Sequence, residues 1–85
     1  MLLFRRSINN VILNKMNIKQ AKQIGEKMRK FRLEKEWTQV ELAKKAGINS
    51  NYYAKLERGE KKVSHEYLTK IAKAFGVGIE DISSH

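Results

Sequence analysis

The sequence predicts a small all-α domain, and three observations support this fold class. The 85 residues include no proline, which favours helices over turn-rich β structure. Apolar residues recur at intervals of three and four from residue 18 onwards. Residues that cap helix N-termini and glycines that end helices divide this pattern into short segments. A chain this short has only a modest core, so a deep catalytic cleft between two lobes is not expected.

Residues 1–17 are expected to form a basic extension, helical or disordered, in front of a domain at residues 18–85. The extension has three basic residues and no acidic one. No apolar run is long enough to span a membrane, and no signal cleavage site follows, so no membrane partner is expected. A transit peptide or surface-seeking helix, or a true start at Met16, are the alternatives. Its apolar residues follow a helical spacing: Phe4, Ile8, Val11, Ile12 and Met16.

The first helix of the domain is predicted over residues 18–35. Asn17 can cap its start, because its side-chain oxygen can accept a hydrogen bond from a free backbone N–H. Lys, Arg and Glu residues separate the apolar positions, as in a helix with one buried face. These apolar positions are Ile18, Ala21, Ile24, Met28 and Phe31.

A second, short helix is predicted over residues 39–46. Thr38 and Glu41 fit a capping box, in which each side chain satisfies a backbone N–H at the helix start. Gly47 can adopt the left-handed conformation that ends helices. The apolar positions are Val40, Leu42, Ala43 and Ala46.

A third helix begins with Asn49 or Ser50 as its cap, runs to about Arg58, and is closed by Gly59. Its inward residues are Tyr53 and Leu56. The outward face is polar and rich in hydrogen-bonding groups rather than densely charged. This face comprises Ser50, Asn51, Tyr52, Lys55 and Arg58.

A fourth helix starts after Ser64, with Glu66 in its first turn, and ends at Gly76. A last short helical turn is predicted over residues 78–82. The apolar stripe of the fourth helix is Tyr67, Leu68, Ile71, Ala72 and Phe75.

The second and third predicted helices carry the signature of a helix-turn-helix, which is two short helices joined by a tight turn containing glycine. The small side chain of Ala43 allows the two helices to approach, Gly47 permits the turn, and Ile48 packs beneath it. The third helix then has one packed face and one free face. A DNA major groove admits one helix, so the free face predicts duplex DNA as the partner. A net charge of +9, most of it within the first 36 residues, also favours a polyanionic partner.

The stretch from Ile24 to Ile82 resembles the Cro/repressor-type (XRE-like) helix-turn-helix domains of phage repressors and small bacterial regulators. The resemblance implies a lambda-repressor-like fold of five helices, with the third as recognition helix. The residues that carry it are Ile24-Gly25-Glu26, Arg32, Thr38-Gln39, Glu41-Leu42-Ala43, Ala46-Gly47-Ile48, Leu56-Glu57-Arg58-Gly59, Leu68 and Ile71-Ala72-Lys73-Ala74-Phe75-Gly76-Val77.

The same resemblance implies roles for individual residues. An ion pair between Arg32 and Glu57 is expected to be structural and mostly buried. The residues expected at DNA base edges are Ser50, Asn51 and Lys55, with Asn49 and Tyr52 as further contacts. The resemblance places Gln39 and Arg58 at DNA phosphates. Independently of it, Thr38 and the basic-loop residues Lys61 and Lys62 are also expected at phosphates. The alternatives are helix capping for Ser50 and Asn51, and a solvated face for the basic residues.

Two positions depart from the family pattern. Glu36 stands where the family often has glycine, so it must adopt a left-handed backbone or reshape the turn, at a cost of about 1–2 kcal/mol. Val63 stands where the family often has proline. Val63 loosens the entry to the fourth helix without touching the DNA face, and both departures are compatible with the fold.

The resulting hypothesis is a cytoplasmic, nucleoid-associated regulator of transcription, such as a repressor, that binds an inverted repeat as a homodimer. The dimer contact is expected around Val77, Ile79 and Ile82. Alternatives on the same fold are a DNA-binding antitoxin, a restriction-system controller, or an adaptor for protein or RNA. Stacking of single-stranded bases on Tyr52 and Tyr53 is disfavoured, because Tyr53 faces inward.

An enzyme is not expected. The absence of cysteine excludes disulfides, thiolate zinc sites and cysteine nucleophiles. The two histidines are far apart in the sequence, and neither a glycine-rich phosphate loop nor clustered carboxylates occur. No metal, cofactor or small-molecule substrate is therefore predicted.

Overall fold

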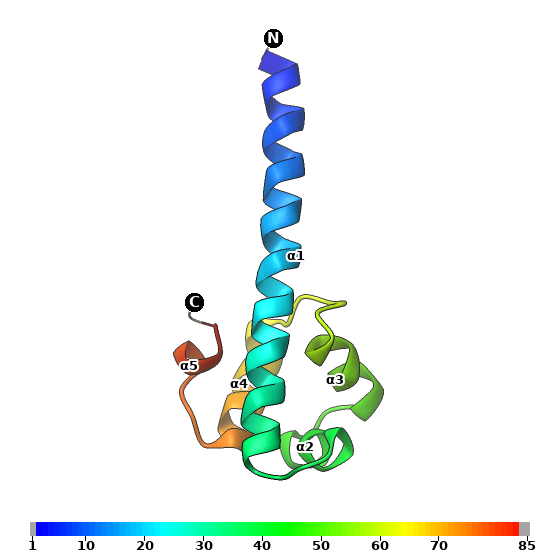
Figure 1. The fold of residues 1–85 in the computed structure, drawn as a ribbon, viewed down its shortest axis with the longest axis vertical. Coiled ribbons are helices and arrows are strands. Elements are labelled where there is room, and N and C mark those ends of the chain that lie inside the picture. Colours follow the sequence, from blue (N-terminus) through cyan, green and yellow to red (C-terminus); the bar gives the residue numbers. More distant parts are fainter. Residues whose placement is uncertain (1, 84–85) are drawn as a thin grey trace.

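The computed structural model describes the backbone of residues 2–83 and the side chains of residues 18–83. Its helices are α1 (Leu2–Glu34), α2 (Gln39–Ala46), α3 (Ser50–Glu57), α4 (His65–Phe75) and α5 (Ile79–Ser83). Helices α2 to α5 gather around the C-terminal half of α1 (Figure 1). Between residues 2 and 83 the chain forms no strand. The predicted all-α class with five helices is confirmed.

Helix α1 is one continuous helix of 33 residues, and its N-terminal half extends away from the other helices (Figure 1). The predicted helix start at residue 18 is therefore wrong, and Asn17 lies within α1 instead of capping it. The physical reason is that no proline or glycine precedes Gly25, so no residue interrupts the helix. The division into an extension and a domain stays a prediction, and the apolar spacing proposed for residues 1–17 concerns side chains outside the described residues.

The predicted caps are present at three helix starts. The side chains of Thr38, Asn49 and Ser64 each accept a hydrogen bond from the backbone N–H three residues later, at 3.0, 3.0 and 3.2 Å. Gly47 and Gly76 end α2 and α4 in the left-handed conformation, with φ of 71° and 76°. Local capping therefore sets the bounds of α2 and α4, and Asn49 sets the start of α3.

The core is formed by one apolar cluster to which each of the helices α1 to α5 contributes. Ile48 is half-buried and packs against this cluster, as predicted. Two predicted core positions are wrong, because Ile18 and Val40 are 56% and 62% exposed. Ile18 lies where α1 leaves the helix cluster, and Val40 lies on the outer side of the short α2. The largest fully buried side chains are Tyr53, Met28, Leu42, Leu56, Ile71 and Ile82.

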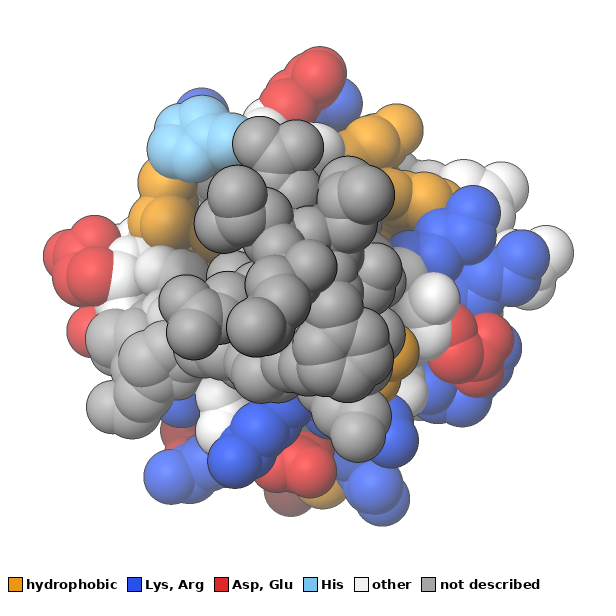
Figure 2. Space-filling model, turned by 90° about the horizontal axis from the view of Figure 1, so that it is seen from above, with side chains coloured by type: hydrophobic (Ala, Val, Ile, Leu, Met, Phe, Trp, Pro, Cys, Tyr) orange, Lys and Arg blue, Asp and Glu red, His pale blue; other side chains and the backbone are white. Residues whose placement is uncertain are grey.

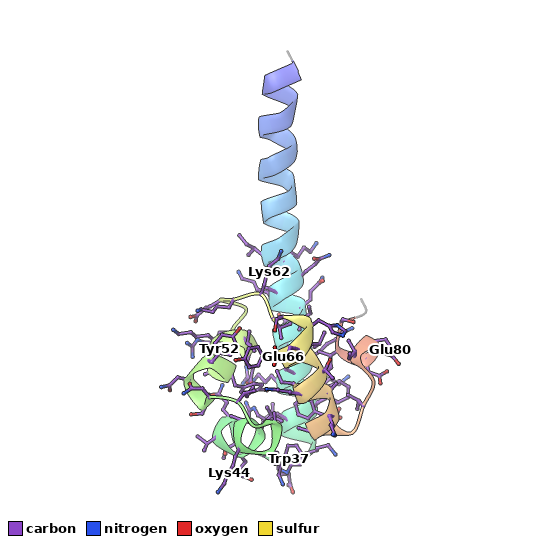
Figure 3. All side chains as sticks on the ribbon, turned by 180° about the vertical axis from the view of Figure 1, so that it is seen from behind. Trp37, Lys44, Tyr52, Lys62, Glu66 and Glu80 are labelled. Carbon is purple, nitrogen blue, oxygen red and sulfur yellow. The ribbon has the colours of Figure 1, made fainter. Side chains whose placement is uncertain are left out.

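The turn between α1 and α2 is held by backbone and aromatic contacts. Glu36 has φ of 59°, so of the two alternatives that the family resemblance left open, a left-handed backbone or a reshaped turn, this residue adopts the left-handed backbone. The ring of Trp37, labelled in Figure 3, stacks on Phe75 of α4 with 6.1 Å between centroids and 11° between planes. This contact attaches the start of α2 to the core.

Candidate nucleic-acid interface

Helices α2 and α3 form the predicted helix-turn-helix. The turn between them is closed by a 2.9 Å hydrogen bond from the Ile48 N–H to the Ala43 carbonyl. Tyr53 and Leu56 bury the inner face of α3, whereas Asn51 and Lys55 are exposed on its outer face. Asn51 and Lys55 are four residues apart, so they lie on the same face of the helix. The outer face of α3 is therefore exposed, and the helix can enter a groove of a nucleic acid.

The cap of α3 separates two roles that the sequence left open. Asn49 is the cap, since its Oδ1 accepts the Tyr52 N–H. Ser50, which is half-buried, and Asn51, which is exposed, are therefore not needed to cap this helix. Their side chains remain candidates for contact with base edges.

Tyr52 is less available than the sequence suggested. It is half-buried, and its ring lies 4.9 Å from that of Tyr67 on α4. Lys61 Nζ lies 5.6 Å from the centre of the Tyr52 ring. The side chain thus supports the end of the helix-turn-helix near the following loop, and a base contact by Tyr52 stays a prediction.

The residues expected at phosphates lie around α3 on several elements. Gln39 is the half-buried first residue of α2, and the hydroxyl of Thr38 is engaged as the cap. Arg58 follows α3, and Lys61 and Lys62 are exposed in the next loop. Seen along α1 from its N-terminal end, Lys and Arg side chains lie on the side where α3 lies and also along the lower edge of the view (Figure 2).

Arg58 is not a free cation. Its Nε donates to Glu60 Oε2, and its Nη2 donates to Glu60 Oε1 at 3.3 Å. Hydrogen bonding to Arg58 lowers the pKa of Glu60, so this carboxylate is charged at neutral pH. The sequence analysis missed this pair, although the spacing of two residues across Gly59 brings the two side chains to the same loop.

Arg32 and Glu57, the residues expected to pair, join α1 to α3. Arg32 Nε and Nη2 donate to the two carboxylate oxygens of Glu57 at 2.9 and 2.7 Å, and Nη1 donates to the Trp37 carbonyl at 2.8 Å. The side chains are only 11% and 4% exposed. The pair fixes the end of α3 relative to α1 and to the turn that precedes α2.

Two opposing effects act on the pKa of Glu57. Burial raises it, but the hydrogen bonds from Arg32 lower it by more, so the net pKa lies below the usual value. Burial beside Glu57 also raises the pKa of the Tyr53 hydroxyl. The Glu57 carboxylate is therefore held in its charged form between α1 and α3.

A hollow lies beside this pair, lined by Arg29, Arg32, Gln39, Glu57 and Arg58. Arg29 was not among the predicted site residues. The available signal was its spacing, since Arg29 and Arg32 are three apart and lie on the same side of α1.

The described side chains include no group of three His, Cys, Asp or Glu residues that could hold a metal ion. None of the helices described is long and apolar enough to cross a membrane.

Residues 28–82 match the family described as helix-turn-helix. The chain is 34% identical over 59 residues to the immunity repressor protein of Bacillus phage phi105, a match covering 69% of this chain and 41% of the repressor. It is 37% identical over 59 residues to the control protein C.BamHI of Bacillus amyloliquefaciens, covering 68% of this chain and 73% of that protein. The chain thus spans less than half the length of the phage repressor.

Among solved structures, the chain is similar to the restriction-modification controller protein C.AhdI of Aeromonas hydrophila. The TM-score is 0.71 at 27% sequence identity, and the match covers 73% of this chain and 94% of C.AhdI. The five-helix arrangement is therefore shared with a solved protein over nearly the whole of that protein.

Proposed function

Because the chain belongs to the helix-turn-helix family, we propose that it is a regulator of transcription that binds duplex DNA sequence-specifically through α3. One observation carries the proposal. The inner face of α3 is anchored by the buried Tyr53 and Leu56, while the outer face presents exposed polar groups. A rigid helix with such a free face fits the major groove, where each base pair displays a distinct pattern of donors and acceptors.

Asn51 and Lys55 are the residues proposed to read base edges, with Ser50 beside them. An asparagine amide can bind adenine N6 and N7 together, and a lysine can donate to guanine O6 or N7. Asn49 and Tyr52 are secondary, because the first caps α3 and the second packs on Tyr67.

Gln39, Thr38, Arg58, Lys61 and Lys62 are proposed to bind phosphates. Such contacts supply most of the affinity and set the register of the protein on the duplex, but they carry no sequence information. They lie at the start of α2 and beyond the end of α3, and two of them, Gln39 and Arg58, line one hollow between these elements.

We further propose that the protein acts in the cytoplasm as a homodimer on an inverted repeat, with half-sites about one helical turn apart. Ile82 is fully buried in its own domain, so the structure contradicts the expectation that this side chain contributes to the dimer contact. Val77 and Ile79 are half-buried at the end of the chain and remain the proposed contact residues.

A second candidate function is control of a restriction-modification system. The match covers 73% of C.BamHI and 94% of C.AhdI, whose names identify them as control or controller proteins. This function uses the same DNA chemistry, and it differs only in the promoter that carries the site.

Selection of bound DNA from a random pool tests the proposal. The expected result is an enriched palindromic motif, bound about a thousandfold more tightly than unrelated duplex. A pool that returns no motif, together with weak binding that depends only on salt, would favour the adaptor alternative. Sizing of the complex on the selected duplex measures the number of copies bound.

A further inference from the structure

The hollow between α1, the start of α2 and the end of α3 contains more positive charge than its carboxylate neutralises. Of its three arginines, Arg32 is paired with Glu57. Arg29 and Arg58 are both exposed, and since Arg58 is paired with Glu60, Arg29 supplies the positive charge that is not neutralised. A concave site with this surplus charge suits an anion.

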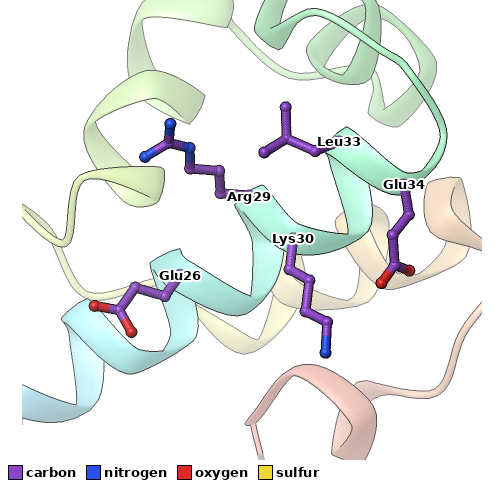
Figure 4. Close-up of a pocket in the computed structure, with 5 residues that line it drawn as sticks. All are labelled: Glu26, Arg29, Lys30, Leu33 and Glu34. Carbon is purple, nitrogen blue, oxygen red and sulfur yellow. The ribbon is translucent and has the colours of Figure 1, made fainter.

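Arg29 faces this site. In the close-up of a second pocket, which Arg29 also lines, its side chain extends toward α3, whereas the next residue, Lys30, extends toward α5 (Figure 4). Within residues 18–83, the side chain of Arg29 has no ion-pair or hydrogen-bond partner. Its guanidinium is therefore available to a ligand, while Lys30 provides a neighbour of equal charge on a different side of the helix.

Arg58, on the opposite side of the hollow, is occupied by Glu60. The two side chains are 53% and 50% exposed, so water competes with their ion pair. An exposed pair of this kind contributes little to stability, and another anion can replace the carboxylate at small cost. Two oxygens of a phosphate can accept the pair of hydrogen bonds that the Arg58 guanidinium now donates to the Glu60 carboxylate.

We propose that this hollow binds one backbone phosphate of the DNA between Arg29 and Arg58, and that the phosphate displaces Glu60 from Arg58. The inference rests on the proposed function and adds Arg29 as a phosphate ligand. Gln39, the first residue of α2, also lines this hollow. Glu60 acts as a positioning residue, because it holds Arg58 until the phosphate replaces it.

The first test compares Arg29→Ala with Lys30→Ala, which removes the same charge from the same helix. Dissociation constants are measured across a salt series, on the selected duplex and on an unrelated duplex. Arg29→Ala is expected to weaken both complexes about three- to tenfold and to reduce the slope of log affinity against log salt by about one. Equal effects of the two variants would remove Arg29 from the interface. Unfolding curves of both variants confirm that they fold.

The second test compares Glu60→Gln with Glu66→Gln, which removes an exposed carboxylate of α4, labelled in Figure 3, from its pair with Lys70. Glu60→Gln is expected to tighten binding to both duplexes about threefold or more, and by more than Glu66→Gln does. In an Arg58→Ala background the gain is expected to disappear. A gain that persists there would show direct repulsion between Glu60 and DNA and would overturn the exchange.

The outcomes separate this inference from the function beneath it. If pool selection returns no motif, the proposed function fails. If a motif is found but the Arg29 and Glu60 variants match their controls, only the phosphate exchange fails.

Discussion

Arg32 donates two parallel hydrogen bonds to Glu57, at 2.9 and 2.7 Å, and so joins the last turn of α1 to the last turn of α3. The remaining nitrogen, Nη1, donates to the Trp37 carbonyl just before α2. One guanidinium therefore sets the relative positions of three helices, two of which form the proposed DNA surface.

Replacement of Arg32 by alanine is expected to lower the free energy of unfolding by about 3–5 kcal/mol, because it leaves the Glu57 carboxylate buried without its partner. Denaturant unfolding measures the loss. Lys30→Ala serves as the control, since an exposed lysine is removed from the same helix. A loss below about 1 kcal/mol would mean that the pair contributes no more than a surface ion pair.

Stability is expected to fall at acid pH through Glu57. Its pKa is lower in the folded protein than in the unfolded chain, so its contribution is complete above about pH 5 and is lost as the pH falls through the folded value. Unfolding free energies measured from pH 7 to pH 3 test this. Glu57→Gln should be less stable at pH 7 and should show a shallower decline with acid. An unchanged decline would assign acid sensitivity to other carboxylates.

Asn51→Ala is expected to relax the preference for one base pair and to cost about 1–3 kcal/mol on the selected duplex. Binding to an unrelated duplex should stay nearly the same, because the amide contributes to readout rather than to phosphate attraction. Gln20→Ala, which removes an exposed amide from α1, is the control. A uniform loss on every duplex would contradict the base-reading role of Asn51.

Glu36→Gly is expected to stabilise the protein by about 0.5–1 kcal/mol. Glu36 adopts φ of 59°, a conformation that glycine adopts without steric cost, although glycine also gains freedom in the unfolded chain. Thermal unfolding measures the change, and DNA affinity should be unaffected. A lower melting temperature would mean that the Glu36 side chain contributes contacts that outweigh the relief of strain.

The sequence predicted the elements whose ends are set locally. The side chains of Thr38, Asn49 and Ser64 each cap a helix by accepting a hydrogen bond from the backbone N–H three residues later. Glycines end α2 and α4. Such signals depend on neighbouring residues alone and can be read without the fold. The predicted pairing of Arg32 with Glu57 instead came from the resemblance to a family.

Features that depend on packing were less predictable. Apolar spacing marks Ile18 and Val40 as core residues, but more than half of each is exposed among the described residues. Asn17 resembles a cap, yet a helix that is not interrupted continues through it. The stacking of Trp37 on Phe75 and the orientation of Arg29 toward α3 depend on how distant segments meet.

The threefold hydrogen bonding of Arg32 has a practical consequence for any survey of variants. Substitution of Arg32 is expected to lower the fraction of folded protein and also to shift α3 in the molecules that still fold. Both effects lower the apparent DNA affinity, and their factors multiply. Apparent affinities of such variants must be divided by the folded population before a residue is credited with touching DNA.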